Sequence, residues 1–117
     1  MPLRNDIIAL IESARLPLAD EKILQAELAR LFDGAGIVYR REVRLSAADI
    51  VDFMIADGLA IEIKIKGQRR AIYKQLERYC AHAHVGEIVL ATNVAMGLPD
   101  AINGKPVGLA RLGRGWL

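Results

Sequence analysis

Two carboxylates and one ammonium group stand in an apolar part of the chain, on what the sequence predicts to be two neighbouring strands. Asp52 lies in the first strand, residues 50–55, and Glu62 and Lys64 lie in the second, residues 60–65. Side chains alternate between the two faces of a strand, so Glu62 and Lys64 share a face. If Asp52 joins them, the two carboxylates repel each other, and a cation that prefers oxygen ligands, Mg²⁺ or Mn²⁺, relieves the repulsion. Lys64, about 7 Å from Glu62 along the strand, could then contact a phosphate or an attacking water.

The turn between these strands, Ala56-Asp57-Gly58, decides whether Asp52 faces Glu62. A two-residue loop pairs Asp52 with Ile63 and leaves the two carboxylates on opposite faces. A three-residue loop, with Gly58 in the left-handed conformation forming a bulge, sets Asp52 directly opposite Glu62 with Cβ atoms about 5 Å apart. The turn residues suit either loop, so both registers stay open. The alternative to a site is an exposed face of solvated charges, and the apolar flanks of both strands argue against it.

The elements that must position these residues follow from hydrophobic periodicity and capping residues. One helix is expected between Asp6, a candidate N-cap, and Pro17, and a second from Asp20, another N-cap, to the glycines at 34 and 36. The remaining segments are a strand over 37–45, a helix over 68–83, a strand over 88–91, a loop over 97–106 and a strand over 107–112. The order α-α-β-β-β-α-β-(β) predicts an α/β (α+β) fold in a single domain, residues 1–117, with a mixed central sheet flanked by helices.

Asp52 followed by Glu62-Ile63-Lys64 across a hairpin resembles the PD-(D/E)xK nuclease superfamily, in which an Asp and a Glu-x-Lys on adjacent strands bind the metal. Val51 stands where the motif has proline. Many members take a further acidic residue from a preceding helix, and Glu21, at the start of its helix, is preferred here over Glu27. The helix after the strands carries Gln75-Leu76-Glu77-Arg78-Tyr79, which is similar to the Gln-x-x-x-Tyr signature of the RecB-like branch. The resemblance implies a restriction-endonuclease-like fold.

The resemblance also implies roles for these residues in metal-dependent hydrolysis of DNA, either structure-selective or non-specific. Asp52, Glu62 and the backbone carbonyl of Ile63 would hold one Mg²⁺ or Mn²⁺, and Glu21 would reach the ion directly or through water. Lys64 would act on the water or the phosphate, with Gln75 and Tyr79 in support. Basic residues that follow form a candidate track for the DNA backbone: Lys66, Arg69, Arg70, Lys74 and Arg78. The alternative function is a nuclease-fold module that binds DNA or protein without cleavage.

Composition sets broader limits on the chain. Hydrophobic residues make up 53% and charged residues 26% of 117 residues, which excludes a disordered or low-complexity protein. The net charge of +2 favours no partner, so a nucleic-acid interface must rest on where the charges lie. Cys80 is the only thiol, so no internal disulfide can form, and we expect a cytoplasmic protein without a membrane span. A homodimer would supply a second active site and a wider basic surface.

Two other polar patterns are set aside. Cys80, His82 and His84 have a spacing that suggests zinc, but residues two apart on a helix diverge by about 200° and cannot converge on one ion. Asp49 is an alternative acidic partner for Glu62, but it has the opposite strand parity to Asp52 and is expected to face away.

Overall fold

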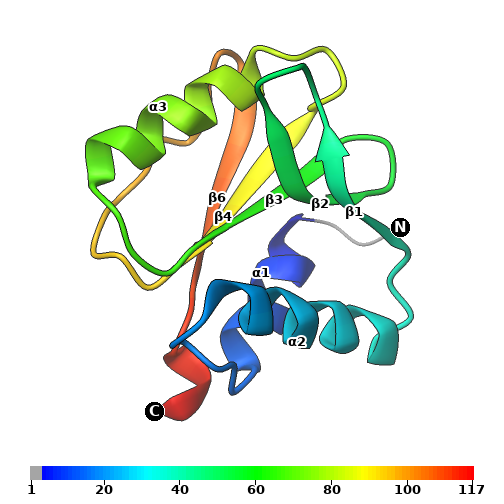
Figure 1. Cartoon of the computed structure of the whole chain (residues 1–117), viewed down its shortest axis with the longest axis vertical. Helices are drawn as coiled ribbons and strands as arrows, with labels where there is room; N and C mark the ends of the chain where they lie inside the picture. The colour runs from blue at the N-terminus through cyan, green and yellow to red at the C-terminus, as the bar shows by residue number, and fades with distance from the viewer. Residues whose placement is uncertain (1–3) are drawn as a thin grey trace.

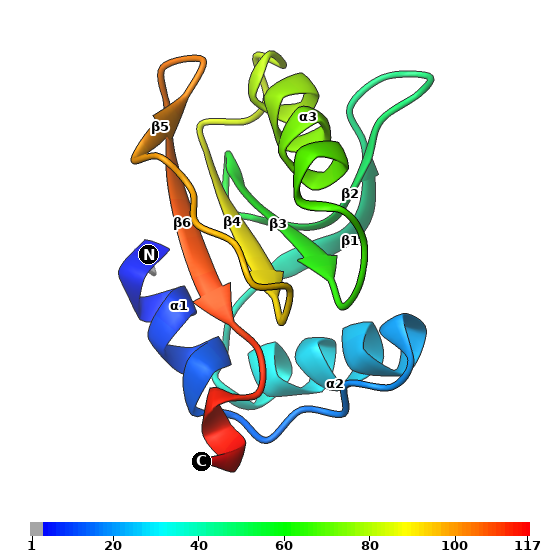
Figure 2. The ribbon, with the colours of Figure 1, turned by 90° about the vertical axis from the view of Figure 1, so that its left-hand side faces the viewer.

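The computed structural model describes residues 4–117, which form a six-stranded mixed sheet with helices on both faces. Figures 1 and 2 show α3 covering one face of the sheet, with α1 and α2 against the other. The elements in chain order are α1 Arg4–Ser13, α2 Glu21–Gly34, β1 Tyr39–Arg44, β2 Ile50–Ile55, β3 Leu59–Lys64, α3 Arg69–Cys80, β4 Glu87–Thr92, β5 Ala101–Ile102, β6 Lys105–Arg111 and a 3-10 turn Arg114–Trp116. The predicted mixed α+β fold is confirmed.

The sheet has the strand order β1-β2-β3-β4-β6-β5. Strands β1, β2 and β3 form an antiparallel meander, and β5 pairs with β6 in an antiparallel arrangement as well. Strand β4 is parallel to both of its neighbours, β3 and β6, and α3 is the crossover from β3 to β4. The apolar run in β4 is buried on both faces because it lies inside the sheet, as its sequence predicts.

Strand alternation divides the apolar side chains between two cores. The core on the α1 and α2 side contains Phe53, Ile61 and Ile63 of the sheet, packed against residues such as Leu28 and Phe32 of α2. The core on the α3 side is built from the opposite parity and from α3 and its flanks: Met54, Ala60, Leu90, Ile72, Leu76 and Tyr79 are among its members. Glu62 has the parity of Ala60, so its carboxylate enters the α3 side of the sheet.

The helix ends partly follow the predicted caps. Asp20 is the N-cap of α2, and its carboxylate accepts a hydrogen bond from the backbone N–H of Ile23 at 2.9 Å. Gly36 has a φ of 72°, in the left-handed region that ends the helical path. The prediction of Asp6 as an N-cap is wrong, because α1 begins at Arg4 and Asp6 lies in its first turn.

Other predicted boundaries shift by a few residues. Helix α3 ends at Cys80, so the predicted span 68–83 is too long at both ends. The predicted loop 97–106 contains the two-residue strand β5, which exists only because it pairs with β6. The local hydrophobic pattern is too weak to predict either the end of α3 at Cys80 or the short strand β5.

Candidate metal and active site

The hairpin between β2 and β3 has the three-residue loop. The ladder pairs Phe53 with Ile61 and Ile55 with Leu59, which leaves residues 56–58 as the turn and sets Asp52 opposite Glu62. The left-handed residue is Ala56, with a φ of 52°, and not Gly58 as predicted; Gly58 has a φ of 156°. Glycine is still favoured at position 58, because a Cβ there would lie 3.0 Å from the backbone nitrogen of Gly86 and other residues rarely adopt this φ.

Where β2 and β3 separate, the two carboxylates accept the hydrogen bonds that backbone carbonyl groups accept elsewhere in the ladder. The backbone N–H of Asp52 donates to Oε1 of Glu62 at 3.2 Å, and the backbone N–H of Ile63 donates to Oδ2 of Asp52 at 2.9 Å. Each strand therefore binds the acidic side chain of the other. This reciprocal arrangement brings Asp52 and Glu62 together and excludes the register that would have put them on opposite faces.

The pair carries more negative charge than its surroundings compensate. Glu62 is only 3% exposed, and burial, followed by the charge of Asp52, raises its pKa from 4.5 to about 8. Burial also raises the pKa of Asp52, against the opposing effect of the Ile63 N–H. The Lys64 ammonium lies 3.7 Å from Oε2 of Glu62 and favours its ionised form without outweighing these effects. A further positive charge at the pair would relieve the repulsion.

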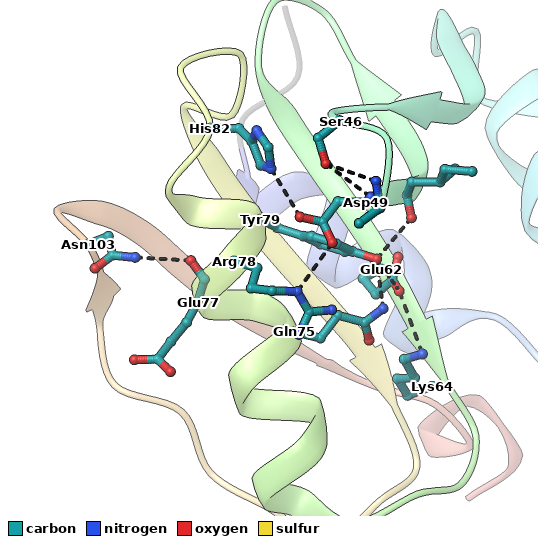
Figure 3. Close-up of polar contacts among 12 residues, drawn as sticks. Ser46, Asp49, Glu62, Lys64, Gln75, Glu77, Arg78, Tyr79, His82 and Asn103 are labelled. Carbon is teal, nitrogen blue, oxygen red and sulfur yellow. Dashed lines mark hydrogen bonds and ion pairs between the residues drawn. The ribbon is translucent and has the colours of Figure 1, made fainter.

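The Tyr79 hydroxyl links α3 to the carboxylates (Figure 3). It lies 2.9 Å from the backbone oxygen of Ile50 and 3.3 Å from Oε2 of Glu62, and it accepts a hydrogen bond from the Gln75 side chain at 2.7 Å. A hydroxyl has one proton, so it can donate to only one of these oxygens at a time. Burial, followed by the charge of Glu62, raises the pKa of Tyr79, which keeps the hydroxyl protonated. Of the two residues that the resemblance implies as supporting ones, Tyr79 thus contacts Glu62 directly and Gln75 reaches the site through Tyr79.

The structure decides which of the two candidate glutamates on α2, Glu21 or Glu27, lies beside the carboxylate pair. Glu21 lines a pocket of about 400 Å³ together with Asp52, and a second pocket of about 470 Å³ together with Lys64. Its charge adds to the burial that raises the pKa of Asp52. Glu27 instead pairs with Arg30 of its own helix at 3.4 Å. Glu21 is therefore the helical acid beside the pair.

Thr92 is a residue of the site's surroundings that sequence reasoning missed. It ends β4 next to Lys64, and it is 1% exposed. Its hydroxyl donates to the backbone oxygen of Lys64 at 2.5 Å and accepts from the backbone N–H of Val94 at 3.0 Å. The signal in the sequence is a polar residue directly after the apolar run 88–91, at the carboxyl edge of a parallel strand.

Asp49 forms a separate polar cluster on the α3 side. It is 6% exposed, and its two oxygens contact Nε of Arg78 at 3.2 Å and Nε2 of His82 at 3.1 Å. The hydrogen bond from His82, with the contribution of Arg78, lowers the pKa of Asp49. Figure 3 shows this cluster beside Tyr79, on the same helix face that serves Glu62. The prediction that Asp49 faces away from Glu62 is wrong: Asp49 lies just before β2, outside the alternating strand, and meets α3 on the side of the sheet that Glu62 enters. The cluster fixes α3 against the sheet and adds no carboxylate to the pair.

The predicted basic track is exposed but not uniform. Lys66, Arg69, Arg70 and Lys74 are exposed and form no ion pair within residues 4–117, whereas Arg78 is held by Asp49. Lys66 shares the pocket of Lys64 and Glu21, and the two arginines line a neighbouring pocket with Gly67 and Gln68. The track therefore begins beside the carboxylates and continues along the first half of α3.

The donor set fits a hard divalent cation better than a zinc ion. Within residues 4–117, no three side chains of His, Cys, Asp or Glu are grouped closely enough to hold a metal ion by themselves. A Mg²⁺ ion commonly uses one or two carboxylates and keeps several waters, which matches Asp52 and Glu62 with the Ile63 carbonyl. Cys80 is buried and unpaired, and with His82 and His84 it forms no metal group in this part of the chain.

Comparison of the chain with protein-family models, with curated proteins and with solved structures finds no match in any of the three. Within the described residues, no helix has the length and apolar character needed to cross a membrane. Function must therefore be inferred from the chemistry of the site.

Proposed function

We propose that this protein is a Mg²⁺- or Mn²⁺-dependent nuclease of the PD-(D/E)xK type that hydrolyses phosphodiester bonds in DNA. The observation that carries the proposal is the reciprocal pairing of the half-buried Asp52 with the buried Glu62, which is short of positive charge and is followed on β3 by Lys64. A buried carboxylate whose pKa is raised to about 8 is costly for folding and is typical of a functional site. The Gln75–Tyr79 contacts and the position of Glu21 support the same function.

In this mechanism Asp52, Glu62 and the Ile63 carbonyl would hold the cation. When bound, the cation would lower the pKa of a water and compensate charge on the phosphate. Lys64 orients that water or binds a phosphate oxygen, since its ammonium is already held beside Glu62. The water oxygen forms a bond to phosphorus and releases one proton to the solvent, the bond from phosphorus to the leaving oxygen breaks, and the leaving oxygen takes up a proton from the solvent. Tyr79 and Gln75 hold the carboxylate of Glu62 in place, and Glu21 accepts a hydrogen bond from a water near the pair.

Substrate binding is assigned to the basic track. Each phosphate neutralised by Lys66, Arg69, Arg70 or Lys74 should add about 0.9 to the slope of log affinity against log salt concentration. Contacts of this kind carry no base information, so we expect cleavage that depends on DNA structure or shows little preference. The buried free thiol of Cys80 is in keeping with a cytoplasmic setting.

The test is cleavage of plasmid, linear and branched DNA by the purified chain with and without Mg²⁺. Asp52→Asn and Glu62→Gln should each lower the Mg²⁺-dependent rate by at least about a hundredfold, because each removes a ligand charge. Glu77→Gln is the matched control, since Glu77 is an exposed acid on α3 and should cleave like the wild type. Unchanged cleavage by the Glu62→Gln protein would refute the site. Wild-type binding of DNA without cleavage in Mg²⁺ or Mn²⁺ would instead favour a non-cleaving module.

A further inference from the structure

A further pocket lies on the α3 side of the sheet, at the hairpin end of β2 and away from the Glu21 side of the site. It has a volume of about 390 Å³, within the range of about 300–1,000 Å³ typical of small-ligand sites. We propose that it binds one nucleotide, either free or unpaired in a strand, and that guanine is the preferred base. The proposal does not require that the protein cleaves DNA.

The floor of the pocket is apolar. It is formed by Met54, which is 2% exposed, and by the partly buried Val43 and Leu45, which pack against the core on the α3 side. Val43 and Leu45 keep part of their side chains exposed, and they offer an aliphatic surface on which a planar ring can lie above the buried Met54. Inorganic phosphate would gain nothing from such a floor, whereas a ring attached to the phosphate would be partly removed from water there.

The rim of the pocket is charged. Arg40 lies directly opposite Met54 in the β1–β2 ladder, so its guanidinium stands at the edge of the floor. Arg44 completes the basic part of the rim, with His84 beside it, and Nη1 of Arg44 is fixed by a hydrogen bond to the backbone oxygen of Ala47 at 3.1 Å. Two guanidinium groups beside an apolar floor suit a phosphate attached to a ring, because arginine binds phosphate oxygens in pairs and stacks on bases.

Asp57 gives the rim a single carboxylate, at the turn between β2 and β3. A carboxylate repels the phosphate but accepts hydrogen bonds from N–H groups, so it selects a base that presents donors. Guanine carries an exocyclic N2 amino group next to its ring N1–H, and thymine has no amino group. The two donors of guanine match the two oxygens of Asp57, and thymine leaves one of them unpaired.

The pocket is distinct from the carboxylate site because it shares no lining residue with the pocket that contains Asp52 and Glu21. Arg40 points to the α3 side with Met54, whereas its neighbour Arg41 lies opposite Phe53, with its guanidinium carbon 5.5 Å from the Phe53 ring centroid. Arg41 lines the pocket that contains Asp52 and Glu21. These two adjacent arginines therefore form a matched pair, with one in each pocket.

The test is calorimetric titration of the whole chain, in EDTA, with dGMP, dTMP and inorganic phosphate. We expect dGMP to bind saturably and at least about fivefold more tightly than dTMP, the lower limit for one bidentate base contact. Arg40→Gln should weaken dGMP at least about tenfold through the lost phosphate contact. Asp57→Asn should bring the dissociation constants of dGMP and dTMP to within about twofold of each other, because the base contact is lost and the phosphate contact is kept. Arg41→Gln should leave all three titrations unchanged.

Several results would overturn the proposal: dGMP that binds no better than dTMP or phosphate, full affinity for dGMP in the Arg40→Gln protein, or equal weakening of dGMP binding by Arg41→Gln.

A second titration decides the source of the nucleotide. It compares dGMP with a thymine pentamer that carries one central guanine and with an all-thymine pentamer. Tighter binding of the guanine pentamer identifies an unpaired base in a strand, and tighter binding of dGMP identifies a free nucleotide. Equal binding of the two pentamers would count against the proposal. Because no cleavage is needed, a failure here leaves the proposed nuclease untouched, and the reverse also holds.

Discussion

Replacing Glu62 by glutamine is expected to stabilise the metal-free protein, and the gain should increase with pH. The folded-state pKa of Glu62 is about 8 against an ordinary value of 4.5, so the folded state holds a proton that the unfolded state has already lost. Stability therefore falls as the pH rises from about 4.5 to about 8. Each pH unit in that window removes about 1.4 kcal/mol, which amounts to about 3 kcal/mol at pH 7 and about 5 kcal/mol above pH 8.

Glutamine has nearly the shape of glutamate but no charge to bury. Its carbonyl oxygen can still accept the Asp52 N–H, and its amide can donate to the Tyr79 hydroxyl, so the packing of the site is kept. The free energy of unfolding in urea, followed by circular dichroism in EDTA, should differ between variant and wild type by about 1 kcal/mol at pH 5 and by about 3 kcal/mol at pH 7.

Metal addition should reverse the order of stability. At pH 7 a cation at one thousand times its dissociation constant stabilises the wild type by about 4.1 kcal/mol, which exceeds the variant's gain of about 3 kcal/mol, and it should stabilise the Glu62→Gln protein far less. The exposed Glu77→Gln control should show no pH-dependent difference from the wild type. A variant-to-wild-type difference that stays constant between pH 5 and pH 8.5 would refute the argument, because it would mean that Glu62 is not held protonated by its surroundings.

Three further changes test other parts of the structure. Asp20→Ala removes the α2 cap and should lower the melting temperature by about 4 °C, whereas Glu77→Ala, on the exposed face of α3, should not lower it. Tyr79→Phe removes the donor to the Ile50 oxygen and should cost about 1–2 kcal/mol of unfolding free energy in urea; unchanged stability would contradict the contact. Asp49→Asn should lower the urea midpoint at pH 7, and the loss should shrink on acidification below pH 3.8, because a carboxylate with a lowered pKa stabilises only while it is ionised. A loss that persists unchanged in acid would show that Asp49 acts through packing.

The sequence alone determined the elements and the chemical character of the site. Alternating and continuous apolar runs placed β2, β3 and β4, because a strand's period of two leaves little freedom in which residues are buried. The same alternation put Glu62 and Lys64 on one face, and helical spacing put Gln75 and Tyr79 on one side of α3. These assignments depend on residues close in sequence, which is why they could be made without coordinates.

The tertiary structure decided which side chains meet. Residues 56–58 suit two loops equally, and the register was settled by packing of the hydrophobic faces and by the Gly58 carbonyl, which accepts from the backbone N–H of Gly86 at 2.9 Å. The choice of Glu21 over Glu27 depends on how α2 crosses the sheet, and the pairing of Asp49 with Arg78 joins residues 29 positions apart. Burial of Thr92 and the raised pKa of Glu62 likewise come from neighbours on other elements. Such contacts depend on how separate elements pack together in three dimensions, and no local pattern in the chain encodes that.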